Sequence, residues 1–487
     1  MSGKSLEELT RAIEIPCKII GNPGVMITSL SLDSRTIEPG SLFCCIDGAK
    51  YKGSDFIDEA LGHGCVAVLT GRELEIEIPQ VIVEADLVRP VMARVASHFW
   101  DTPSKKIQII GVTGTNGKTT LTKMLESIFS KAGVQISVMG TLSGQFTTPE
   151  SLDLQRWLSQ RVEMRDQIVA MEVSSHGIAT NRVDCIEFDI AIFTNLSHDH
   201  LDFHKSMDEY FASKAALFSS RYSASALVNI DTAWGIRLKD SIDIPFQTYS
   251  IAEANDIDMT SQGTKFLLGS RKINLKLVGK HNVANAIGAY KAAKQLGLDD
   301  DAIVAGLEGL EKVDGRMERL EVGQDFEVFV DFAHTPDALK TLLDQVGYIT
   351  PNGRVILVFG CGGMRDKAKR PEMGRIAYAG ADTIIITSDN PRSESPHEII
   401  EAIAAGAGNY ESDRILKQAN REWAIQHAIG LASSGDTVVI AGKGHETYQD
   451  FGDRVTTFDD RKIAIRAIAM KLAKGSDSLL SRWDKYQ

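Results

Sequence analysis

The chain has 487 residues, which is too long for one hydrophobic core and predicts two to four domains. With 43% hydrophobic and 24% charged residues, the composition excludes a disordered, collagenous or coiled-coil protein. The net charge of -12 argues against a protein that follows nucleic-acid phosphates, so we expect no nucleic-acid partner.

The cysteines and the N-terminus predict a cytoplasmic location. None of the six cysteines forms a CxxC pair, which favours a reduced protein. Cys44 and Cys45 are adjacent, so on a strand they should point to opposite faces. The N-terminal segment lacks the apolar core of a signal peptide, and no apolar run is long enough to span a bilayer. We therefore expect no membrane insertion.

The first block of the chain, up to about residue 104, mixes short strands and helices. Its apolar segments include VMITSLSLDSR, SLFCCIDG and CVAVLT. A polar segment with a proline, residues 101–106, follows them and is typical of a linker. This block is predicted to form a smaller α/β domain.

The second block begins with the apolar strand KIQIIGVTG, and a helix is expected over 118–131. Further strands are expected at 168–173, 189–195 and 226–230, with helical patterns between several of them. Alternating strands and helices predict a parallel α/β sheet.

The third block begins near residue 315 and repeats this alternation. Strands are expected at 326–332, 354–360, 382–388 and 436–442, and helices at 336–347, 397–405, 419–432 and 459–473. The pattern predicts a second, doubly wound α/β unit.

The most informative local pattern is GVTGTNGKTT, residues 111–120, between a strand and a helix. Glycines let backbone N–H groups surround phosphate oxygens, and the helix N-terminus adds positive charge. Lys118 can reach terminal phosphates, and Thr119 can ligate Mg²⁺. Val112 stands where the phosphate-loop pattern has its first glycine, so a glycine-rich turn with an incidental lysine is the alternative. The order strand, loop, helix favours phosphate binding.

Two further segments carry metal-ligating side chains. Glu172 ends an apolar strand, where a carboxylate commonly helps to hold Mg²⁺. The loop 194–204 contains three histidines and two aspartates, which indicates a metal or phosphate site. The spacing of His198, His200 and Asp202 also fits a zinc hydrolase, but that reading leaves the glycine-rich loop and Glu172 without a role. Lys214 lies on an amphipathic helix and, from the residues alone, is a surface lysine.

An ordered set of motifs resembles the Mur ligase family of peptidoglycan synthesis. The motifs are LDSRTIEPGSLF (32–43), GTNGKTT (114–120), MEVSSHG (171–177), TNLSHDHLDFH (194–204), GKHNVANAIGA (279–289), GRME (315–318), DFAHTPDAL (331–339), GCGGMRDKAKRP (360–371), SDNPR (388–392) and AGKGHETYQ (441–449). They cover all three blocks in the family's order.

The resemblance implies three domains. These are a UDP-sugar-binding N-terminal domain (1–104), a central ATP-binding P-loop domain with a parallel sheet (105–314), and a C-terminal amino-acid-binding Rossmann-like domain (315–487). It also implies an ATP-dependent amide ligase of cell-wall synthesis, which serves cell shape and division. The DNPR motif is similar to that of members which add meso-diaminopimelate to UDP-MurNAc-L-Ala-D-Glu through an acyl phosphate, releasing ADP and phosphate.

The resemblance assigns the nucleotide and metal residues. ATP would contact Gly114, Thr115, Asn116, Gly117, Lys118, Thr119, Thr120, Asn282, Arg316 and Asp331. Two Mg²⁺ ions would be held by Thr119, Glu172, His200 and Lys214, the last as a carbamate formed with CO₂. The catalytic residues would be Lys118, Glu172, His200 and Lys214.

The resemblance also assigns residues to the other two substrates. UDP-MurNAc-dipeptide would contact Ser34, Arg35, Thr147, Thr148, Ser174, Thr180, Arg182 and Lys214. Diaminopimelate would contact Arg365, Asn390, Arg392, Gly442 and Glu446. An arginine fork suits its distal carboxylate and a glutamate its distal ammonium, whereas lysine would leave buried arginines unpaired. Met364, His198 and Thr180 depart from the family's usual residues.

Other functions remain open at this point. They are a lysine-adding homologue, a ligase similar to folylpolyglutamate synthase, and a non-enzymatic protein that binds ATP. A regulatory GTPase is disfavoured because no NKxD-like motif follows the loop. We expect a monomer.

Overall fold

The computed structural model describes residues 3–48, 51–144, 146–201, 203–408 and 413–475. Within them the chain divides into two compact units. The first comprises the chain up to Gly114, Phe129–Thr194 and Phe211–Thr248; the second comprises Thr115–Ile128, Asn195–Tyr210 and the chain from Tyr249 onward. The chain therefore leaves the first unit inside the glycine-rich loop.

The N-terminal region of the first unit is built on a five-stranded sheet. Its order is β2 (Lys18–Ile20), β7 (Gln80–Ile82), β6 (Cys65–Thr70), β5 (Ser41–Cys44) and β4 (Ser29–Ser31), with only the β2–β7 pair antiparallel. The other elements are α1 (Leu6–Arg11), α2 (Ile57–Gly62), α3 (Val88–Phe99) and the short pair β1 (Lys4–Ser5) and β3 (Met26–Ile27).

Side chains alternate between two cores along β5, as expected for a strand covered on both faces. Leu42 and Cys44 pack into the core that contains α1 and α3. Phe43 and Cys45 pack into the other, beside α2. The predicted opposite orientation of Cys44 and Cys45 is therefore confirmed.

The second sheet of this unit lies in the central part of the chain. Its order is β13 (Phe246–Tyr249), β12 (Ala226–Asn229), β11 (Ile190–Phe193), β8 (Gln108–Thr113), β10 (Ile168–Glu172) and β9 (Ile136–Met139). From β12 to β9 all pairs are parallel, as predicted. Its helices are α4 (Lys118–Lys131), α5 (Ser151–Glu163), α6 (Ser175–Ala179), α7 (Met207–Ala215) and α8 (Ala233–Lys239). The predicted helix 118–131 matches α4.

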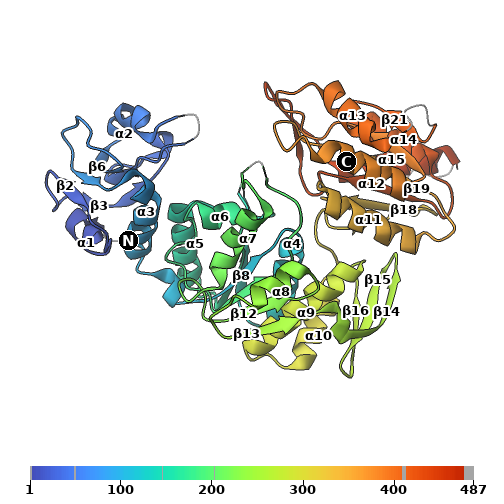
Figure 1. Cartoon of the computed structure of the whole chain (residues 1–487), viewed down its shortest axis with the longest axis horizontal. Helices are drawn as coiled ribbons and strands as arrows, with labels where there is room; N and C mark the ends of the chain where they lie inside the picture. Colours follow the sequence, from blue (N-terminus) through green and yellow to red (C-terminus); the bar gives the residue numbers. More distant parts are fainter. Residues whose placement is uncertain (1–2, 49–50, 145, 202, 409–412, 476–487) are drawn as a thin grey trace. The chain divides into compact units, whose positions relative to one another are not determined.

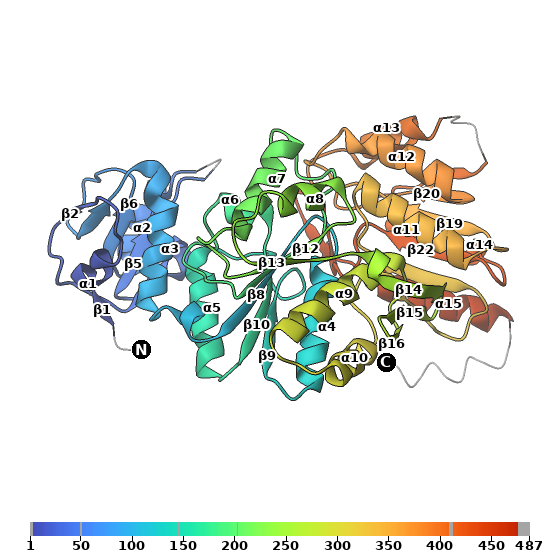
Figure 2. The same cartoon turned by 60° about the horizontal axis from the view of Figure 1, so that its bottom comes forward.

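Polar contacts join the two sheets' regions within the first unit. Helices α3 and α5 lie side by side in both views (Figures 1 and 2). Arg89 on α3 pairs with Glu150 at the start of α5 at 2.7 Å, and Arg156 on α5 donates to the carbonyl of Leu30 at 3.2 Å. The central sheet and the N-terminal sheet are thus held together by charged as well as apolar contacts.

A small antiparallel sheet of the second unit was not predicted. It consists of β14 (Ala254–Thr260), β15 (Gly263–Leu268) and β16 (Arg271–Leu275) and precedes α9 (Lys280–Gln295) and α10 (Asp300–Gly309). Its strands carry charged and polar side chains, several of them exposed, among their apolar ones. They therefore lack the continuous apolar runs that revealed the buried strands.

The C-terminal sheet of the second unit is doubly wound, as predicted. Its order is β17 (Glu318–Arg319), β18 (Glu327–Asp331), β22 (Thr437–Ala441), β19 (Val355–Phe359), β20 (Thr383–Ile386) and β21 (Ile415–Lys417), and only the β17–β18 pair is antiparallel. Its helices are α11 (Pro336–Ile349), α12 (Lys369–Gly380), α13 (Pro396–Ala404), α14 (Arg421–Leu431) and α15 (Asp460–Gly475); β23 (Tyr448–Asp450) and β24 (Val455–Thr457) form a hairpin.

Alternate side chains of this sheet build one core on each face. Leu357 and Phe359 pack with α11, α12 and α13, whereas Ile356 and Val358 pack with α14 and α15. Helix α12 was not predicted, because Pro371 stands near its start. A proline in the first turn removes only an N–H that has no partner within the helix, so α12 tolerates it.

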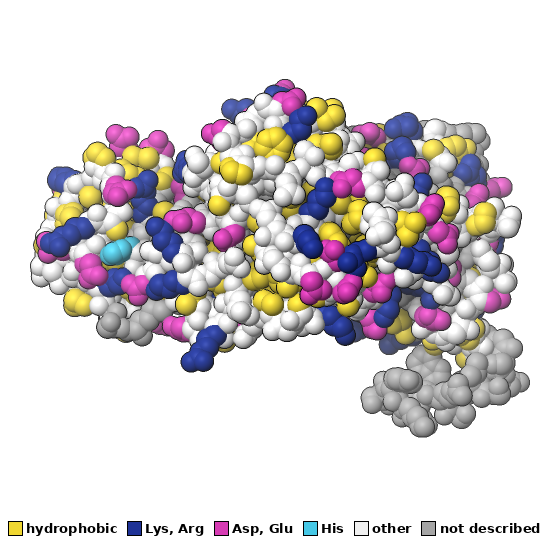
Figure 3. Space-filling view, turned by 90° about the horizontal axis from the view of Figure 1, so that it is seen from below, with side chains coloured by type: hydrophobic (Ala, Val, Ile, Leu, Met, Phe, Trp, Pro, Cys, Tyr) yellow, Lys and Arg dark blue, Asp and Glu magenta, His cyan; other side chains and the backbone are white. Residues whose placement is uncertain are grey.

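The surface carries both signs of charge. On the face shown in Figure 3, acidic and basic side chains are interspersed. In the part of the chain that the structure describes, no helix is long and apolar enough to cross a membrane. The fold class, three α/β regions each with its own sheet, agrees with the sequence-based prediction.

Candidate active site

The glycine-rich loop follows β8 and leads into α4. Gly114 and Gly117 adopt positive φ values of +150° and +88°. A Cβ atom at position 117 would lie 2.6 Å from Oδ1 of Asn285, so the turn requires glycine for both its backbone angle and its space. The sequence thus encodes a sharp turn between the strand and the helix.

Neutral side chains hold this loop in the second unit. Asn195, directly after the strand β11, accepts a hydrogen bond from Asn116 N–H at 2.9 Å and donates to the Asn116 carbonyl at 3.1 Å. The Thr115 hydroxyl accepts from Ser197 N–H at 3.0 Å and lies 3.1 Å from the hydroxyl of Tyr210. Sequence analysis assigned no role to Asn195 or Tyr210. Asn195 stands inside the motif TNLSHDHLDFH, which was the available signal.

Cationic side chains meet the start of α4. The Lys118 ammonium donates to the carbonyl of Thr115 at 2.9 Å. The Arg316 guanidinium donates to the Thr119 hydroxyl at 3.3 Å and stacks on the ring of Phe332, 4.5 Å from its centroid. Two cations, a hydroxyl and a helix N-terminus therefore lie together, a combination that suits a polyphosphate.

Two other predicted nucleotide residues are buried and hydrogen-bonded. Asp331, at the end of β18, accepts from Met317 N–H at 2.6 Å and Ala333 N–H at 2.7 Å. Burial raises the pKa of the Asp331 carboxyl, although Arg316 opposes this shift. Asn282, on α9, donates to the carbonyl of Val278 at 2.9 Å. Both side chains are therefore held in place by backbone groups of the second unit.

In the first unit, Glu172 ends β10 and is 1% exposed. Its carboxylate accepts from the backbone N–H of Thr141 at 2.9 Å and from the Thr141 hydroxyl at 3.1 Å. The Thr141 hydroxyl lies 3.1 Å from that of Thr147. A buried carboxylate oriented by a neighbouring backbone group is suited to hold a divalent cation.

The predicted dipeptide residues surround this strand end. Thr148 donates to the main-chain oxygen of Glu172 at 3.0 Å and accepts from Ser174 N–H at 2.9 Å. Arg182 donates to the Thr148 carbonyl at 3.0 Å and pairs with Glu150 at 3.1 Å. The structure therefore brings Thr147, Thr148, Ser174 and Arg182 together beside Glu172.

The remaining dipeptide residues lie elsewhere in the first unit. The Thr180 hydroxyl, at the end of α6, donates to the His176 carbonyl at 2.6 Å. In the N-terminal region, the Ser34 hydroxyl donates to Glu59 at 2.5 Å. Arg35 is exposed and pairs with Asp33 at 2.7 Å, which raises the pKa of the Arg35 guanidinium. An exposed arginine leaves its guanidinium accessible to a ligand.

Lys214 is buried, so its reading as a surface lysine was wrong. It lies on α7 with 2% of its surface exposed, and its ammonium donates to the carbonyl of Gly114 at 2.9 Å. The neighbouring Ser213 hydroxyl donates to the carbonyl of Ser175 at 3.0 Å. Periodicity placed Lys214 on the polar side of the helix, but that side faces the end of the central sheet.

The histidine-rich loop forms a compact polar cluster in the second unit. His200 has a φ of +55° and lies 3.3 Å from Asp199. Burial alone would raise the pKa of Asp199, but His200, His334 and Lys369 together lower it. His204 is buried and stacks on Tyr210, with ring centroids 5.1 Å apart.

The zinc site that the sequence suggested in this loop would use His198, His200 and Asp202. His198 is exposed, and Asp202 of the predicted zinc triad lies outside the described residues. Among the residues that the structure describes, no group of three or more His, Cys, Asp and Glu side chains lies close enough to hold an ion.

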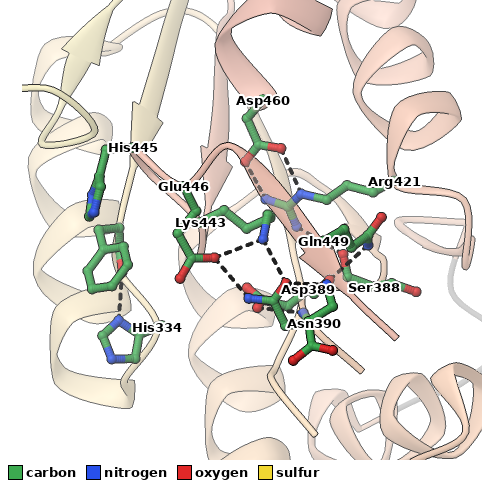
Figure 4. A network of polar contacts seen from close by, with 12 residues as sticks. His334, Ser388, Asp389, Asn390, Arg421, Lys443, His445, Glu446, Gln449 and Asp460 are labelled. Atoms are coloured by element: carbon green, nitrogen blue, oxygen red, sulfur yellow. Dashed lines mark hydrogen bonds and ion pairs between the residues drawn. The ribbon is translucent and has the colours of Figure 1, made fainter. Parts of the chain in front are cut away.

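The predicted amino-acid residues lie at the ends of β20 and β22 in the second unit. The Asn390 amide donates to Glu446 at 2.9 Å (Figure 4). Lys443, which sequence analysis did not assign, donates to Glu446 at 2.8 Å and to Asn390 at 3.0 Å. Gly442 has a φ of +114°, and a Cβ there would lie 2.7 Å from Asp389. Lys443 stands inside the AGKGHETYQ motif, and only this position in the sequence could have indicated that it has a role in the site.

The neighbouring turn carries the arginines of the predicted fork. Arg392 donates to the carbonyl of Gly363 at 2.7 Å. Arg365 lies exposed in the bend that follows Gly363 and Arg392 is partly buried, so the expectation that both arginines are buried is wrong. Glu394 accepts from Arg370 at 3.0 Å and from Met364 N–H at 2.5 Å, and the hydrogen bond from Arg370 is the main reason that the pKa of Glu394 falls to about 2. The exposed Met364 thus contributes its backbone to this turn.

Comparison with known proteins defines the class of protein. Family models match residues 26–100 (Mur ligase family, catalytic domain), 112–293 (Mur ligase middle domain) and 315–444 (Mur ligase, glutamate ligase domain). The chain belongs to the Mur ligase family.

Two proteins that are similar to this chain over most of its length carry the same enzyme name. A protein of Syntrophomonas wolfei is 41% identical over 467 residues, covering 92% of this chain and 95% of its own length. A protein of Geobacillus kaustophilus is 41% identical over 473 residues, covering 92% and 96%. Both are named UDP-N-acetylmuramoyl-L-alanyl-D-glutamate--2,6-diaminopimelate ligase.

Solved structures share the fold. A structure of a ligase with this name is 32% identical, with a TM-score of 0.66, and covers 97% of this chain and 100% of its own. MurF of Acinetobacter baumannii is 18% identical, with a TM-score of 0.67, covering 97% and 99%. Folylpolyglutamate synthase of Mycobacterium tuberculosis is 16% identical, with a TM-score of 0.60, covering 71% and 90%. The last two similarities concern the fold alone.

Proposed function

We propose that this chain is an ATP-dependent ligase that joins meso-diaminopimelate to UDP-MurNAc-L-Ala-D-Glu. The observation that carries the choice of substrates is the 41% identity, over 92% of the chain, to a ligase named for them. The strand, glycine-rich loop and helix at residues 108–131 support a nucleotide triphosphate as the energy source.

The reaction would proceed in two steps. A carboxylate oxygen of the substrate's glutamate attacks the γ-phosphorus of ATP, and the bond to the bridging oxygen breaks, giving ADP and an acyl phosphate. The amine of diaminopimelate then attacks the acyl carbon, loses a proton and expels phosphate. Lys118 and Arg316 would stabilise the charge that develops on the phosphate oxygens.

The donor set at the loop and strand end suits magnesium. The carboxylate of Glu172 and the hydroxyl of Thr119 are oxygen ligands of the kind that Mg²⁺ prefers, and His200 adds a neutral nitrogen. An ammonium at Lys214 would repel the ion, whereas a carbamate formed with CO₂ would present oxygens to it. When bound, two Mg²⁺ ions would offset phosphate charge. Thr119, Glu172, His200 and Lys214 are our proposed ligands.

The amino-acid pocket would select diaminopimelate through charge. Arg365 and Arg392 would bind the distal carboxylate and Glu446 the distal ammonium, with Asn390 next to Glu446 in the same site. At the end of β22, Gly442 lets the chain pass close to Asp389, since a Cβ there would lie 2.7 Å from the Asp389 carboxylate. Lysine has the ammonium but lacks the carboxylate, so it would desolvate the arginines without compensation.

The other assignments complete the proposal. ATP would be bound by Gly114 to Thr120 with Asn282, Arg316 and Asp331, and the UDP-sugar dipeptide by Ser34, Arg35, Thr147, Thr148, Ser174, Thr180, Arg182 and Lys214. Residues 1–104, 105–314 and 315–487 would be the three functional domains. ATP and a UDP-sugar as substrates favour a cytoplasmic enzyme, and we propose that it is a monomer.

Substrate-dependent ADP release tests the proposal. Purified protein is given ATP and Mg²⁺ with UDP-MurNAc-L-Ala-D-Glu or a folate, and with meso-diaminopimelate, lysine or glutamate. We expect ADP release only with the muramoyl dipeptide and diaminopimelate. Equal or faster release with lysine would make the chain a lysine-adding homologue, and release with the folate and glutamate would indicate a folate ligase. No release with any pair would leave a non-enzymatic nucleotide-binding protein.

A further inference from the structure

Lys443 is an unusual feature of the amino-acid pocket because its side chain is completely buried. It is 0% exposed, and its ammonium contacts two of the proposed ligand-binding residues, Glu446 and Asn390, at 2.8 and 3.0 Å. Burying a lysine is costly unless its charge is paired and its donors are used. A ligand cannot reach this ammonium directly, so any role in binding must act through its neighbours.

Lys443 is one of three neighbours that fix how the Asn390 amide is oriented. Asn390 Oδ1 accepts from Lys443 and from the backbone N–H of Asp450 at 3.0 Å, and its Nδ2 donates to Glu446 at 2.9 Å. A flipped amide would set its NH₂ group against two donors and its oxygen against a carboxylate. Only one orientation satisfies all three neighbours.

The same ammonium restrains Glu446. Oε2 of Glu446 accepts from both Lys443 and Asn390, while the side chain remains 20% exposed. The opposite edge of the carboxylate is therefore presented toward solvent. The ring of Tyr448 covers the ammonium, 5.3 Å from its centroid, and limits the access of water to the pair.

A second buried pair fixes the two strand ends that carry these residues. Arg421, fully buried, pairs with Asp460 at 2.6 Å and donates to the carbonyls of Ser388 at 3.3 Å and Ala441 at 3.0 Å. Ser388 lies two residues before Asn390, and Ala441 two residues before Lys443 (Figure 4). The Arg421–Asp460 pair thus anchors both segments that carry the network.

We infer that Lys443 is a positioning residue of the amino-acid site. It holds Asn390 and Glu446 in the one arrangement in which the glutamate edge meets the substrate's distal ammonium. It touches no substrate and takes no part in phosphoryl transfer. This inference rests on the proposed function, in which Glu446 and Asn390 bind the amino acid.

A double-mutant cycle tests the inference. The variants are Lys443→Met, Glu446→Gln and the double variant, with Lys340→Met as control, since Lys340 forms an exposed pair with Asp344 on α11. We expect Lys443→Met to raise KM for diaminopimelate about 10- to 100-fold, as for one partner of a buried charge pair, and to leave KM for ATP within about twofold. In the Glu446→Gln background the same change should raise KM by about twofold or less, because its target is already removed.

Additive effects, or equal increases in KM for all substrates, would overturn the inference. Melting temperatures identify variants that fail to fold, and Lys443→Gln, which keeps a donor for Asn390, then replaces Lys443→Met in the same cycle. If the wild-type protein ligates no diaminopimelate, the proposed function fails. If the wild type is active and the cycle is additive, only the role of Lys443 fails.

Discussion

The glycine-rich loop and the amino-acid pocket hold their functional side chains in different ways. The loop is held by amides and hydroxyls, including those of Asn195, Thr115 and Tyr210, and by the Lys214 ammonium, which donates to the carbonyl of Gly114. The pocket is held by charged pairs, namely Lys443 with Glu446, Arg370 with Glu394 and Arg421 with Asp460. Each region thus uses the kind of support that its ligand allows.

The proposed ligands explain the difference. A triphosphate carries several negative charges, and cationic side chains beside the loop, such as Lys118 and Arg316, would attract it. An amino acid with an ammonium and a carboxylate at its distal end is a zwitterion, so paired charges in its pocket keep both signs in fixed positions. The following predictions test this contrast, beginning with the largest effect.

Loss of the loop's lysine should be the most damaging single change. Lys118→Met removes a cation at the γ-phosphate, and we expect kcat to fall about 10²- to 10³-fold, as when one stabilising group of a transition state is removed. The control is Lys123→Met on the same helix, whose ammonium pairs with Glu126 at 2.7 Å. Steady-state ADP release measures both. Similar activity in the two variants would contradict the role of Lys118.

Replacing Lys214 tests whether activity needs a metal ligand at this buried position near the loop. Lys214→Ala should lower kcat about 100-fold, as expected for a group that supports a metal site. Because the proposed ligand is a carbamate, added acetate or another short carboxylate should restore part of the activity. Full activity without additives, or a loss that no carboxylate relieves at any concentration in a folded variant, would argue against the carbamate.

Replacing Gly117 tests whether ATP binding needs the close packing of the loop against Asn285. Gly117→Ala places a Cβ 2.6 Å from Asn285 at a φ of +88°, and strain of about 1–3 kcal/mol should weaken ATP binding about tenfold. Gly133→Ala is the matched control, because its φ is +77° but no atom lies within 4 Å of the added Cβ. Calorimetric titration with ATP distinguishes them. Equal affinities would show that the contact with Asn285 is unimportant.

Replacing His281 should have the smallest effect, and the quantity affected should be the stability of the fold. Burial lowers the pKa of His281 to about 4, and its ring accepts a hydrogen bond from Gln345 at 2.6 Å. The unfolded chain, with a histidine pKa near 6.5, binds a proton earlier as pH falls. The stability from neutral His281 is therefore present above about pH 6.5 and lost toward pH 4.

Thermal melting at several pH values checks this prediction. The difference in melting temperature between the wild type and His281→Gln should be largest at pH 7.5 and shrink at pH 5. A difference that does not change with pH would mean that His281 is not a neutral support.

Sequence analysis predicted the buried strands and the motif loops well, because both are encoded locally. The apolar run at 355–359 and the helix 118–131 need only neighbouring residues to be recognised. Lys214 and Lys443 were misread or missed because their burial depends on groups far along the chain. Lys214 meets a carbonyl 100 residues away, and Lys443 an amide 53 residues away. A single lysine carries no local sign of such partners.

The most direct test of the account follows one oxygen atom. UDP-MurNAc-L-Ala-D-Glu is labelled with oxygen-18 in the glutamate carboxylate and incubated with the protein, ATP, Mg²⁺ and meso-diaminopimelate, and the released phosphate is analysed by mass spectrometry. An acyl-phosphate route through the glycine-rich loop transfers one labelled oxygen to each phosphate. Unlabelled phosphate released during product formation would contradict it.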